Sequence, residues 1–480
     1  MDTDRRGFLG VAGMGLIGSA FFGLRELIRR TEPNRSPAVT SATPSRIGYG
    51  FLVRDSDGIL DLPTGFSYRV ISRRGDEMDD GLLVPGAPDG MATFAGPDGL
   101  TILIRNHELN PDGVGPWGKS RERLGRVDAR MLYDFGHGSA PGCGGTTTVV
   151  FDTKQQKVVR QFLSLAGTTR NCAGGPTPWG SWISCEETVQ RIGPGDKGAM
   201  YTAERDHGYV FEVPATDQIQ IARPIPIKPM GRFNHEAIAV HRPTGIVYET
   251  EDRADGLFYR FLPKSPGNLA AGGRLQALKL IDQPSADTRN WNSKSRNIPV
   301  GERLEVVWLD MHDIESPKDD LRQRGFAAGA ARFARGEGMW SGENEIYFAC
   351  TNGGRKQKGQ IWRYIPSPHE GATDEQRAPG RIELFIEPND GTLIENADNL
   401  TISPWGDLIV CEDRTTPEVR LIGVTPDGEC YTFANNRLRT EFAGATFSPD
   451  GSTLFVNIQG KGLTLAITGP WRDRVATSPS

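Results

Sequence analysis

The segment GSWISCEE at residues 180–187 joins a tight turn, an apolar strand and two adjacent carboxylates. Proline and glycine favour the turn, and the apolar and β-branched residues after it favour a strand. The same phrase recurs five more times along the chain, as GLTILIRNHE (99–108), GIVYETED (245–252), NEIYFACTN (344–352), GDLIVCED (406–413) and STLFVNIQ (452–459). Turns such as FAGPD, HRPT, SPW and SPD precede the copies. The recurrence predicts an all-β chain.

Regular recurrence of one strand type, with variable insertions between the copies, is typical of a β-propeller. We therefore expect a six-bladed β-propeller with irregular insertions. In this interpretation each recurring strand is the first of its blade and lines the central channel. The alternative is a pair of packed β-sheets, in which the strand ends would scatter over two surfaces.

Four of the six recurring strands end in carboxylates, namely Glu108, Glu186 with Glu187, Glu251 with Asp252, and Glu412 with Asp413. Each acid alone is typical of a solvated rim. Several acids near one axis would repel one another and need cations to neutralise them. Carboxylate oxygens favour Ca²⁺ or Mg²⁺, whereas a thiolate favours iron, zinc or copper. Cys172 precedes the second copy and suggests a mixed-metal site, although a lone cysteine is more often a buried apolar residue.

Three further stretches carry candidate site residues. His235 and Glu236 stand before a predicted strand, where a histidine that only fixes a turn is the alternative. Arg335 and Glu337 lie among glycines that let a ligand approach the backbone, and a surface ion pair is the alternative. The segment ENADN supplies Glu395, Asp398 and Asn399, which are also common turn formers. The sequence contains no Walker A motif and no HExxH motif.

The composition and the first residues restrict the class of protein. The 480 residues carry a formal net charge of −5, which argues against nucleic acid as the main partner. Six cysteines without a CxxC pair do not form a dense disulfide framework. Arg5 and Arg6 precede Phe8, Leu9 and a short apolar run, a pattern that resembles a twin-arginine export signal. We expect residues 1–45 to be this signal segment and a linker, and no stable membrane span after processing.

Several of these motifs, in this order, resemble the PhoX-type alkaline phosphatases from about residue 47 to residue 471. The motifs are NCAGGPTPWGSWISCEE, GRFNHEA, YETEDR, RGEGMW, YFACTNGG, NADNLTISPWGDLIVCED and FAGATFSPDGSTLFVNIQ. The resemblance implies a propeller whose channel mouth holds ferric iron and calcium. It assigns the metal ligands to Cys172, Glu186, Glu187, Glu251, Glu337, Asp398 and Asn399, and it places Arg335 against the substrate phosphate. Ala397 departs from the family pattern, which has a proline there.

The resemblance also implies a reaction and a location. The reaction is hydrolysis of small phosphomonoesters, with a metal-bound oxide or hydroxide as the nucleophile. The location is periplasmic or extracellular, reached through the twin-arginine export machinery. We expect residues 46–475 to form a single phosphatase domain and the protein to be a monomer. Two alternatives stay open, a calcium-dependent lactonase-like propeller hydrolase and a non-catalytic propeller with structural calcium.

Overall fold

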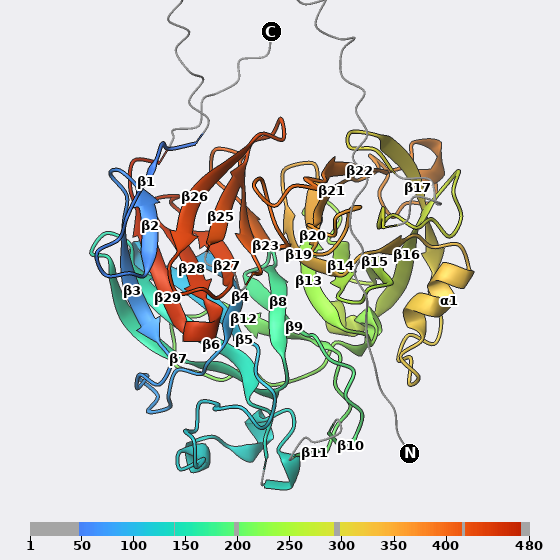
Figure 1. Ribbon diagram of the computed structural model, residues 1–480. Helices are drawn as coiled ribbons and strands as arrows, with labels where there is room; N and C mark the ends of the chain where they lie inside the picture. Colours follow the sequence, from blue (N-terminus) through green and yellow to red (C-terminus); the bar gives the residue numbers. More distant parts are fainter. Residues whose placement is uncertain (1–47, 139, 196–200, 292–297, 415–417, 472–480) are drawn as a thin grey trace, which may run out of the picture. The chain divides into compact units, whose positions relative to one another are not determined.

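The computed structural model describes residues 48–138, 140–195, 201–291, 298–414 and 418–471. Antiparallel β-strands dominate these residues, and one short α-helix, α1 (Leu321–Ala327), is present among them (Figure 1). The predicted export signal in residues 1–45 lies outside the described residues. Within the described part of the chain, no helix has the length and apolar character needed to cross a bilayer.

The strands form six successive groups, which we call blades 1 to 6. Blade 1 contains β4 (Pro88–Ala95), β5 (Thr101–His107), β6 (Gly144–Asp152) and β7 (Lys157–Thr168). Blade 2 contains β8 (Asn171–Pro176), β9 (Ser181–Glu186) and β12 (Val210–Pro214). Blade 3 contains β13 (His235–Val240), β14 (Val247–Glu251), β15 (Gly256–Pro263) and β16 (Gly273–Leu280). Blade 4 contains β19 (Gly336–Ser341), β20 (Ile346–Cys350), β21 (Gln360–Ile365) and β22 (Arg381–Ile386). Blade 5 contains β23 (Ala397–Ile402), β24 (Leu408–Glu412), β25 (Val419–Val424) and β26 (Cys430–Asn436). Blade 6 contains β27 (Phe442–Phe447), β28 (Leu454–Ile458) and β29 (Leu463–Thr468).

Shorter strands lie in the insertions and at the blade edges. β17 (Arg303–Asp310) pairs with both β16 and β22, so hydrogen bonding joins blades 3 and 4 into one sheet. β18 (Arg332–Phe333) pairs with β15, and β10 (Gly193–Pro194) pairs with β11 (Thr202–Ala203).

The first strands of the blades form a closed ring. β4 contacts β8, and the contacts continue through β13, β19, β23 and β27 back to β4. This arrangement is that of a β-propeller, and it confirms the predicted fold class. The recurring strands, however, are β5, β9, β14, β20, β24 and β28, which are the second strands, so the prediction that they line the channel is wrong. A second strand is buried on both faces between neighbouring blades, which explains its continuous apolar run.

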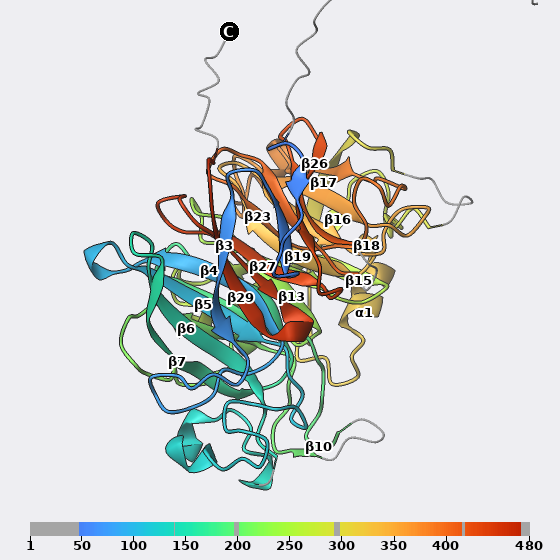
Figure 2. The ribbon, with the colours of Figure 1, turned by 60° about the vertical axis from the view of Figure 1, so that its left-hand side comes forward.

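Both ends of the described chain take part in closing the ring. β3 (Ser67–Arg73) pairs with β29 and so becomes the outermost strand of blade 6 (Figure 2). β2 (Leu60–Pro63) pairs with β26 on the outer side of blade 5, and β1 (Leu52–Val53) pairs with β2. Blades 5 and 6 are therefore built from strands at opposite ends of the sequence.

Small residues let the first strands approach closely around the axis. A Cβ atom added to Gly90 would lie 2.6 Å from the Cα atom of Ala173, and one added to Gly338 would lie 2.6 Å from the Cα atom of Asn399. Larger apolar side chains fill the space between blades, as where Phe258 stacks on Phe348 with ring centroids 4.5 Å apart. The core thus lies between the blades, and polar groups gather where the strands end.

Candidate metal centre

Equivalent positions recur at one end of the ring in all six blades. The residue before each first strand accepts a backbone hydrogen bond from the residue after the second strand. The acceptor and donor pairs, with O···N distances, are Ala87 and Glu108 (2.9 Å), Arg170 and Glu187 (2.9 Å), Asn234 and Asp252 (3.2 Å), Arg335 and Thr351 (3.1 Å), Asn396 and Asp413 (2.9 Å), and Glu441 and Gln459 (3.3 Å). In every blade these bonds hold the start of the first strand next to the end of the second strand, at the same end of the ring.

A β-bulge adds a further equivalent position. In blades 1 to 5 the pairing with the second strand breaks immediately after the first residue of the first strand, and in blade 6 it breaks one residue later. A bulge of this kind re-aims the side chain of the unpaired residue. The second residues of the six first strands are Asp89, Cys172, Glu236, Glu337, Asp398 and Ala443.

The side chains from these positions form a continuous band that we call the acidic cluster. It consists of four overlapping groups, in each of which the ligand atoms lie within 4.8 Å of one another: Asp89, Glu108 and Cys172; Cys172, Glu187 and Glu236; Glu236, Glu337 and Asp398; and Asp398, Asp413 and Glu441. Cys172, Glu236 and Asp398 each belong to two groups, so the band runs without a break from blade 1 to blade 6.

Five members of the acidic cluster are buried, and Glu108, Asp398, Asp413 and Glu441 are half-buried. Burial and the neighbouring carboxylates Asp413 and Asp252 raise the pKa of Asp398 to about 8. Burial, together with Asp413, raises the pKa of Glu441 to about 10, and burial raises the pKa of Glu187 to about 7. The pKa of Glu236 lies well above its usual range for the same reasons. Cations would relieve this repulsion because they stabilise the ionised carboxylates.

Two arginines and two amides border the acidic cluster. Arg335 forms a bidentate pair with Asp252, with Nε–Oδ1 and Nη2–Oδ2 distances of 2.8 and 2.7 Å, and its Nη2 lies 3.1 Å from Glu337 Oε1. Arg170 pairs with Glu108 and Glu187 on the other part of the band. The Gln459 amide donates hydrogen bonds to Asp89 and Glu108, at 2.7 and 3.1 Å.

Four of the predicted metal ligands lie in the acidic cluster, namely Cys172, Glu187, Glu337 and Asp398. The Cys172 thiol lies 3.3 Å from Glu187 Oε2. Asn399 is adjacent to the cluster, because its amide donates to Asp398 Oδ1 at 3.0 Å and its oxygen accepts from the Gly444 amide at 2.8 Å. Arg335 lies at the edge of the cluster, beside Glu337.

The other two predicted ligands, Glu186 and Glu251, lie outside the four groups of the acidic cluster. Glu186 accepts hydrogen bonds from the backbone amides of Thr169 and Gly208, at 3.0 and 2.9 Å. Glu251 accepts from the Tyr259 hydroxyl at 2.9 Å. Each is the last residue of a second strand, and successive strand residues point to opposite faces. The pleat therefore separates Glu186 from Glu187 and Glu251 from Asp252.

Two members of the acidic cluster were missed by sequence reasoning, Asp89 and Glu441. Glu108 and Asp413 were noted only as acids at strand ends, and Glu236 was named a candidate site residue but not a predicted metal ligand. A local signal does exist in the first strands. Each ligand position in blades 1 to 4 is followed directly by glycine or alanine, as in Asp89-Gly90, Cys172-Ala173, Glu236-Ala237 and Glu337-Gly338. The small residue belongs to the bulge and to the close approach of neighbouring first strands.

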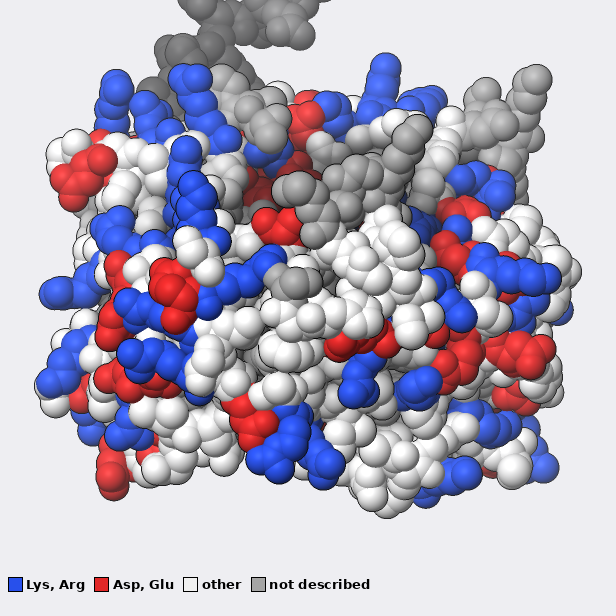
Figure 3. All heavy atoms as spheres, turned by 90° about the horizontal axis from the view of Figure 1, so that it is seen from below, with Lys and Arg blue, Asp and Glu red and all other residues white. Residues whose placement is uncertain are grey.

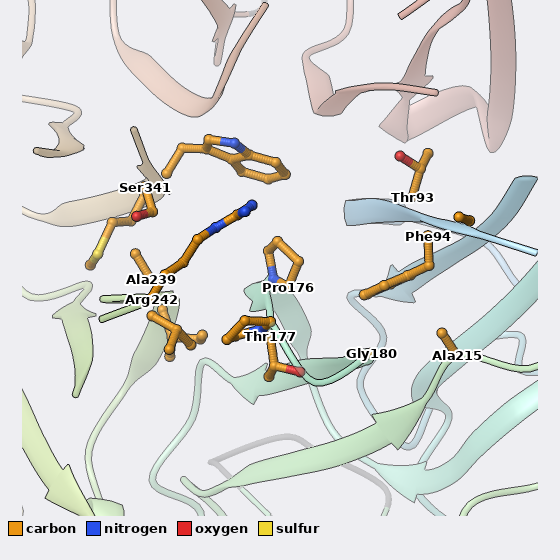
Figure 4. Close-up of a pocket in the computed structure, with 15 residues that line it drawn as sticks. Thr93, Phe94, Pro176, Thr177, Gly180, Ala215, Ala239, Arg242 and Ser341 are labelled. Atoms are coloured by element: carbon orange, nitrogen blue, oxygen red, sulfur yellow. The ribbon is translucent and has the colours of Figure 1, made fainter. Parts of the chain in front are cut away.

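A pocket of about 450 Å³ lies at the far ends of the first strands (Figure 4). Thr93 and Phe94 of β4, Pro176 of β8 and Ser341 of β19 line it, together with Arg242. These residues come late in their strands, whereas the cluster residues come second. The pocket and the acidic cluster therefore lie at opposite ends of the channel.

The donor set of the acidic cluster fits metal ions. Glu236 is 1% exposed, and its Oε2 atom has no hydrogen-bond partner among the described residues. A buried carboxylate oxygen left without a partner is costly, and a cation would satisfy it. One thiol and eight carboxylates in a continuous band offer both a soft ligand and hard oxygen ligands.

Comparisons with known proteins agree with the fold and identify a family. Residues 47–462 match the family described as "Alkaline phosphatase PhoX". The structure of Pseudomonas fluorescens PhoX in complex with vanadate, a transition state analogue, is similar to this chain with a TM-score of 0.62 and 18% identity over 88% of this chain and 97% of that chain. This likeness supports the shared fold. No curated protein sequence matches the chain.

Two gluconolactonase structures are more distant. One is from Xanthomonas campestris, with a TM-score of 0.37 and 13% identity over 89% of this chain and 99% of that chain. The other is a periplasmic gluconolactonase from Pseudomonas aeruginosa, with a TM-score of 0.41 and 12% identity over 86% and 93%. Neither likeness bears on activity. Since the phosphatase family match spans most of the sequence, this chain belongs to the PhoX family of alkaline phosphatases.

Proposed function

We propose that this phosphatase hydrolyses small phosphomonoesters at the acidic cluster, with ferric iron and calcium held by its side chains. The observation that carries the proposal is the unbroken band of ligand atoms contributed by all six blades. A phosphoryl group is an anion, and an acidic cluster can bind it when bound cations offset the negative charge of the carboxylates. The family match supports phosphate ester chemistry.

The donor types suggest how the metals are shared. Cys172, with Glu187 and Glu236, offers the thiolate that favours iron. Asp398, Asp413 and Glu441 offer oxygen atoms alone, which suits calcium. When bound, the ions polarise the phosphoryl group and lower the pKa of water.

Arg335 is the residue we assign to the phosphoryl group. Its planar guanidinium presents paired N–H donors that match two phosphoryl oxygens. Asp252 holds the guanidinium bidentately, and the backbone of Arg335 has a φ of 52°, a strained conformation for a side-chain-bearing residue. The surrounding contacts therefore hold the guanidinium group of Arg335 in place before substrate binds. This lowers the entropic cost of orienting its N–H donors toward the phosphoryl group.

The surface favours a small substrate over nucleic acid. On the face shown in Figure 3, basic and acidic side chains are interspersed, with no continuous basic field. Binding to a phosphate backbone needs such a field.

We further propose export of the folded, metal-loaded monomer by the twin-arginine route to the periplasm or the exterior. The family match and the Arg5–Arg6 motif support this proposal.

The test combines elemental analysis with an activity assay. Protein purified without chelator should contain iron and calcium, and it should hydrolyse p-nitrophenyl phosphate. Incubation with EDTA should abolish the activity, and adding back the metals should restore it. Metal-loaded protein that hydrolyses a lactone but no phosphomonoester would refute the proposal.

A further inference from the structure

Arg170 occupies the same position in blade 2 as Arg335 occupies in blade 4. Each residue directly precedes the first strand of its blade, and its carbonyl accepts the equivalent backbone hydrogen bond, from Glu187 in blade 2 and from Thr351 in blade 4. Each stands two residues before a member of the acidic cluster, Cys172 or Glu337. The two backbones share the same unusual conformation, with φ of 50° and 52°.

Arginine is present at this position in only these two blades. The other four blades have Ala87, Asn234, Asn396 and Glu441 there. The two side chains are also similarly accessible, at 36% exposure for Arg170 and 38% for Arg335. Part of each side chain is therefore in contact with solvent at the border of the cluster.

The contacts of Arg170 leave donor capacity unused. Its Nη2 lies 2.9 Å from Glu108 Oε1 and also pairs with Glu187, while its Nε is buried without a hydrogen-bond partner among the described residues. The Nε atoms of Arg253 and Arg332 are also buried without a partner among the described residues, so this feature alone does not set Arg170 apart, but other arginines use more of their donors. Arg420 in blade 5 uses Nε, Nη1 and Nη2, donating to Glu412 and to the carbonyls of Gly391 and Thr392.

The carboxylates that hold Arg170 are themselves candidate metal ligands. Glu108 and Glu187 belong to two of the four groups that could hold an ion. Their oxygens cannot serve a cation and the guanidinium equally well, so metal binding weakens the ion pairs of Arg170. The released N–H groups need another acceptor, and a phosphoryl oxygen at the cluster is an anionic one.

We infer that Arg170 contacts the phosphoryl group of the substrate from blade 2, as a counterpart to Arg335 in blade 4. This inference rests on the proposed phosphatase site and adds a second arginine to it. Two guanidinium groups on separate blades would match the charge of a phosphomonoester dianion better than that of a diester monoanion. Arg170 thus contributes to the preference for monoesters.

The experiment compares Arg170→Gln, Arg170→Lys and Arg335→Gln with the wild-type protein. The control is Arg130→Gln, which removes an arginine that is 88% exposed and paired with Asp128 outside the cluster. Each protein is assayed for iron and calcium content, for kcat and KM with p-nitrophenyl phosphate and bis(p-nitrophenyl) phosphate, and for competitive inhibition by inorganic phosphate.

We expect Arg170→Gln to retain its metals and to bind inorganic phosphate about 10-fold or more weakly, the effect of losing a charge-assisted hydrogen bond. Activity on the monoester should fall more than activity on the diester. Arg170→Lys should be intermediate because it keeps the charge but not the fork. Arg130→Gln should behave as the wild type.

Two results would overturn the inference while leaving the proposed function intact. One is unchanged phosphate inhibition in Arg170→Gln at full metal content, with Arg335→Gln impaired. The other is a loss of phosphate affinity in both Arg170 variants that is proportional to their loss of metal. In that case Arg170 would only position Glu108 and Glu187 and would not contact the phosphoryl group. A wild-type protein that is fully metal-loaded but inactive on both esters would instead refute the proposed function.

Discussion

Glu186 and Glu187 are neighbours in the chain, yet their carboxylates have no partner in common. Glu186 Oε1 lies 2.6 Å from Nδ1 of the buried His207, whereas Glu187 Oε2 lies 3.3 Å from the Cys172 thiol. Glu186 ends β9 and fastens blade 2 internally, and Glu187 begins the following loop and enters the acidic cluster. One peptide unit thus separates a structural acid from a candidate ligand.

The two glutamates should give opposite mutant phenotypes. Glu186→Ala removes one of the two carboxylates that pair with the buried His207 and takes the acceptor from three backbone amides, so we expect the free energy of unfolding to fall by about 3–5 kcal/mol. Glu187→Ala should leave stability in the presence of metal nearly unchanged and lower the metal content and kcat/KM. Urea denaturation and elemental analysis of both variants measure these effects. Metal loss in Glu186→Ala at temperatures where it stays folded would contradict the division of roles.

Cys172 should be required for iron and Cys185 should not. Both thiols are buried, on the paired strands β8 and β9, but Cys185 lies outside the four metal groups. Cys172→Ala should therefore lose iron while retaining some calcium. Cys185→Ala should keep both metals and lose about 1–2 kcal/mol of stability from the small cavity. Equal iron content in the two variants would remove the thiolate from the proposed site.

Arg335 should act on both substrate binding and turnover. Arg335→Ala removes the fork held by Asp252, so we expect KM to rise and kcat to fall, with kcat/KM lower by about 100-fold or more. Arg335→Lys should recover only part of the loss, because an ammonium lacks the bidentate geometry. Steady-state kinetics with p-nitrophenyl phosphate, corrected for metal content, measure this effect. Unchanged kinetics would exclude Arg335 from the reaction.

Metal removal should make stability depend on pH in a defined direction. Burial and neighbouring carboxylates hold the pKa of Asp398 at about 8 and that of Glu187 at about 7, whereas the same groups in the unfolded chain titrate near 4. Between these values the folded state binds more protons than the unfolded state. The stability of the metal-free protein should therefore fall as pH rises from about 4 to about 8.

Metal-loaded protein should lack this slope, because bound cations keep the carboxylates ionised. Tm values at pH 5, 6.5 and 8, with and without EDTA, measure the difference, which should widen with pH. In the metal-free protein, Asp398→Asn should be less sensitive to pH than the wild type. A Tm that rises with pH after metal removal would show that the cluster is not the dominant titrating group.

The fold could be predicted from the sequence because each second strand has a complete local signature. The strand of GDLIVCED, for example, has a turn before it and a continuous apolar run that is buried on both faces. Of the first strands, the sequence predicted a strand only after His235 and Glu236, where β13 lies. In β8 the run NCAGGP has few large apolar residues, since the close packing of neighbouring first strands requires small side chains.

The site could be predicted only in part, because the pleat and the bulges decide which acid points where. Residue type alone does not distinguish Glu251 from Asp252, and a shift of one position reverses the face. Asp89 follows a proline in a segment with no strand-like pattern, and Glu441 stands alone before β27. Their place in the band depends on backbone pairings between residues far apart in the sequence, such as Glu441 with Gln459 in blade 6.

The pairing of β3 with β29 joins the two ends of the described chain in blade 6. Blade 6 lacks its outermost strand until residues 67–73 meet residues 463–468, so the ring stays open while the chain is being synthesised. A chain halted before β29 would already contain every residue of the acidic cluster, since Glu441 is the last of them, but it would lack the strand that joins β3 to blade 6. Blade 6 can therefore be completed only after nearly the whole described chain has been synthesised.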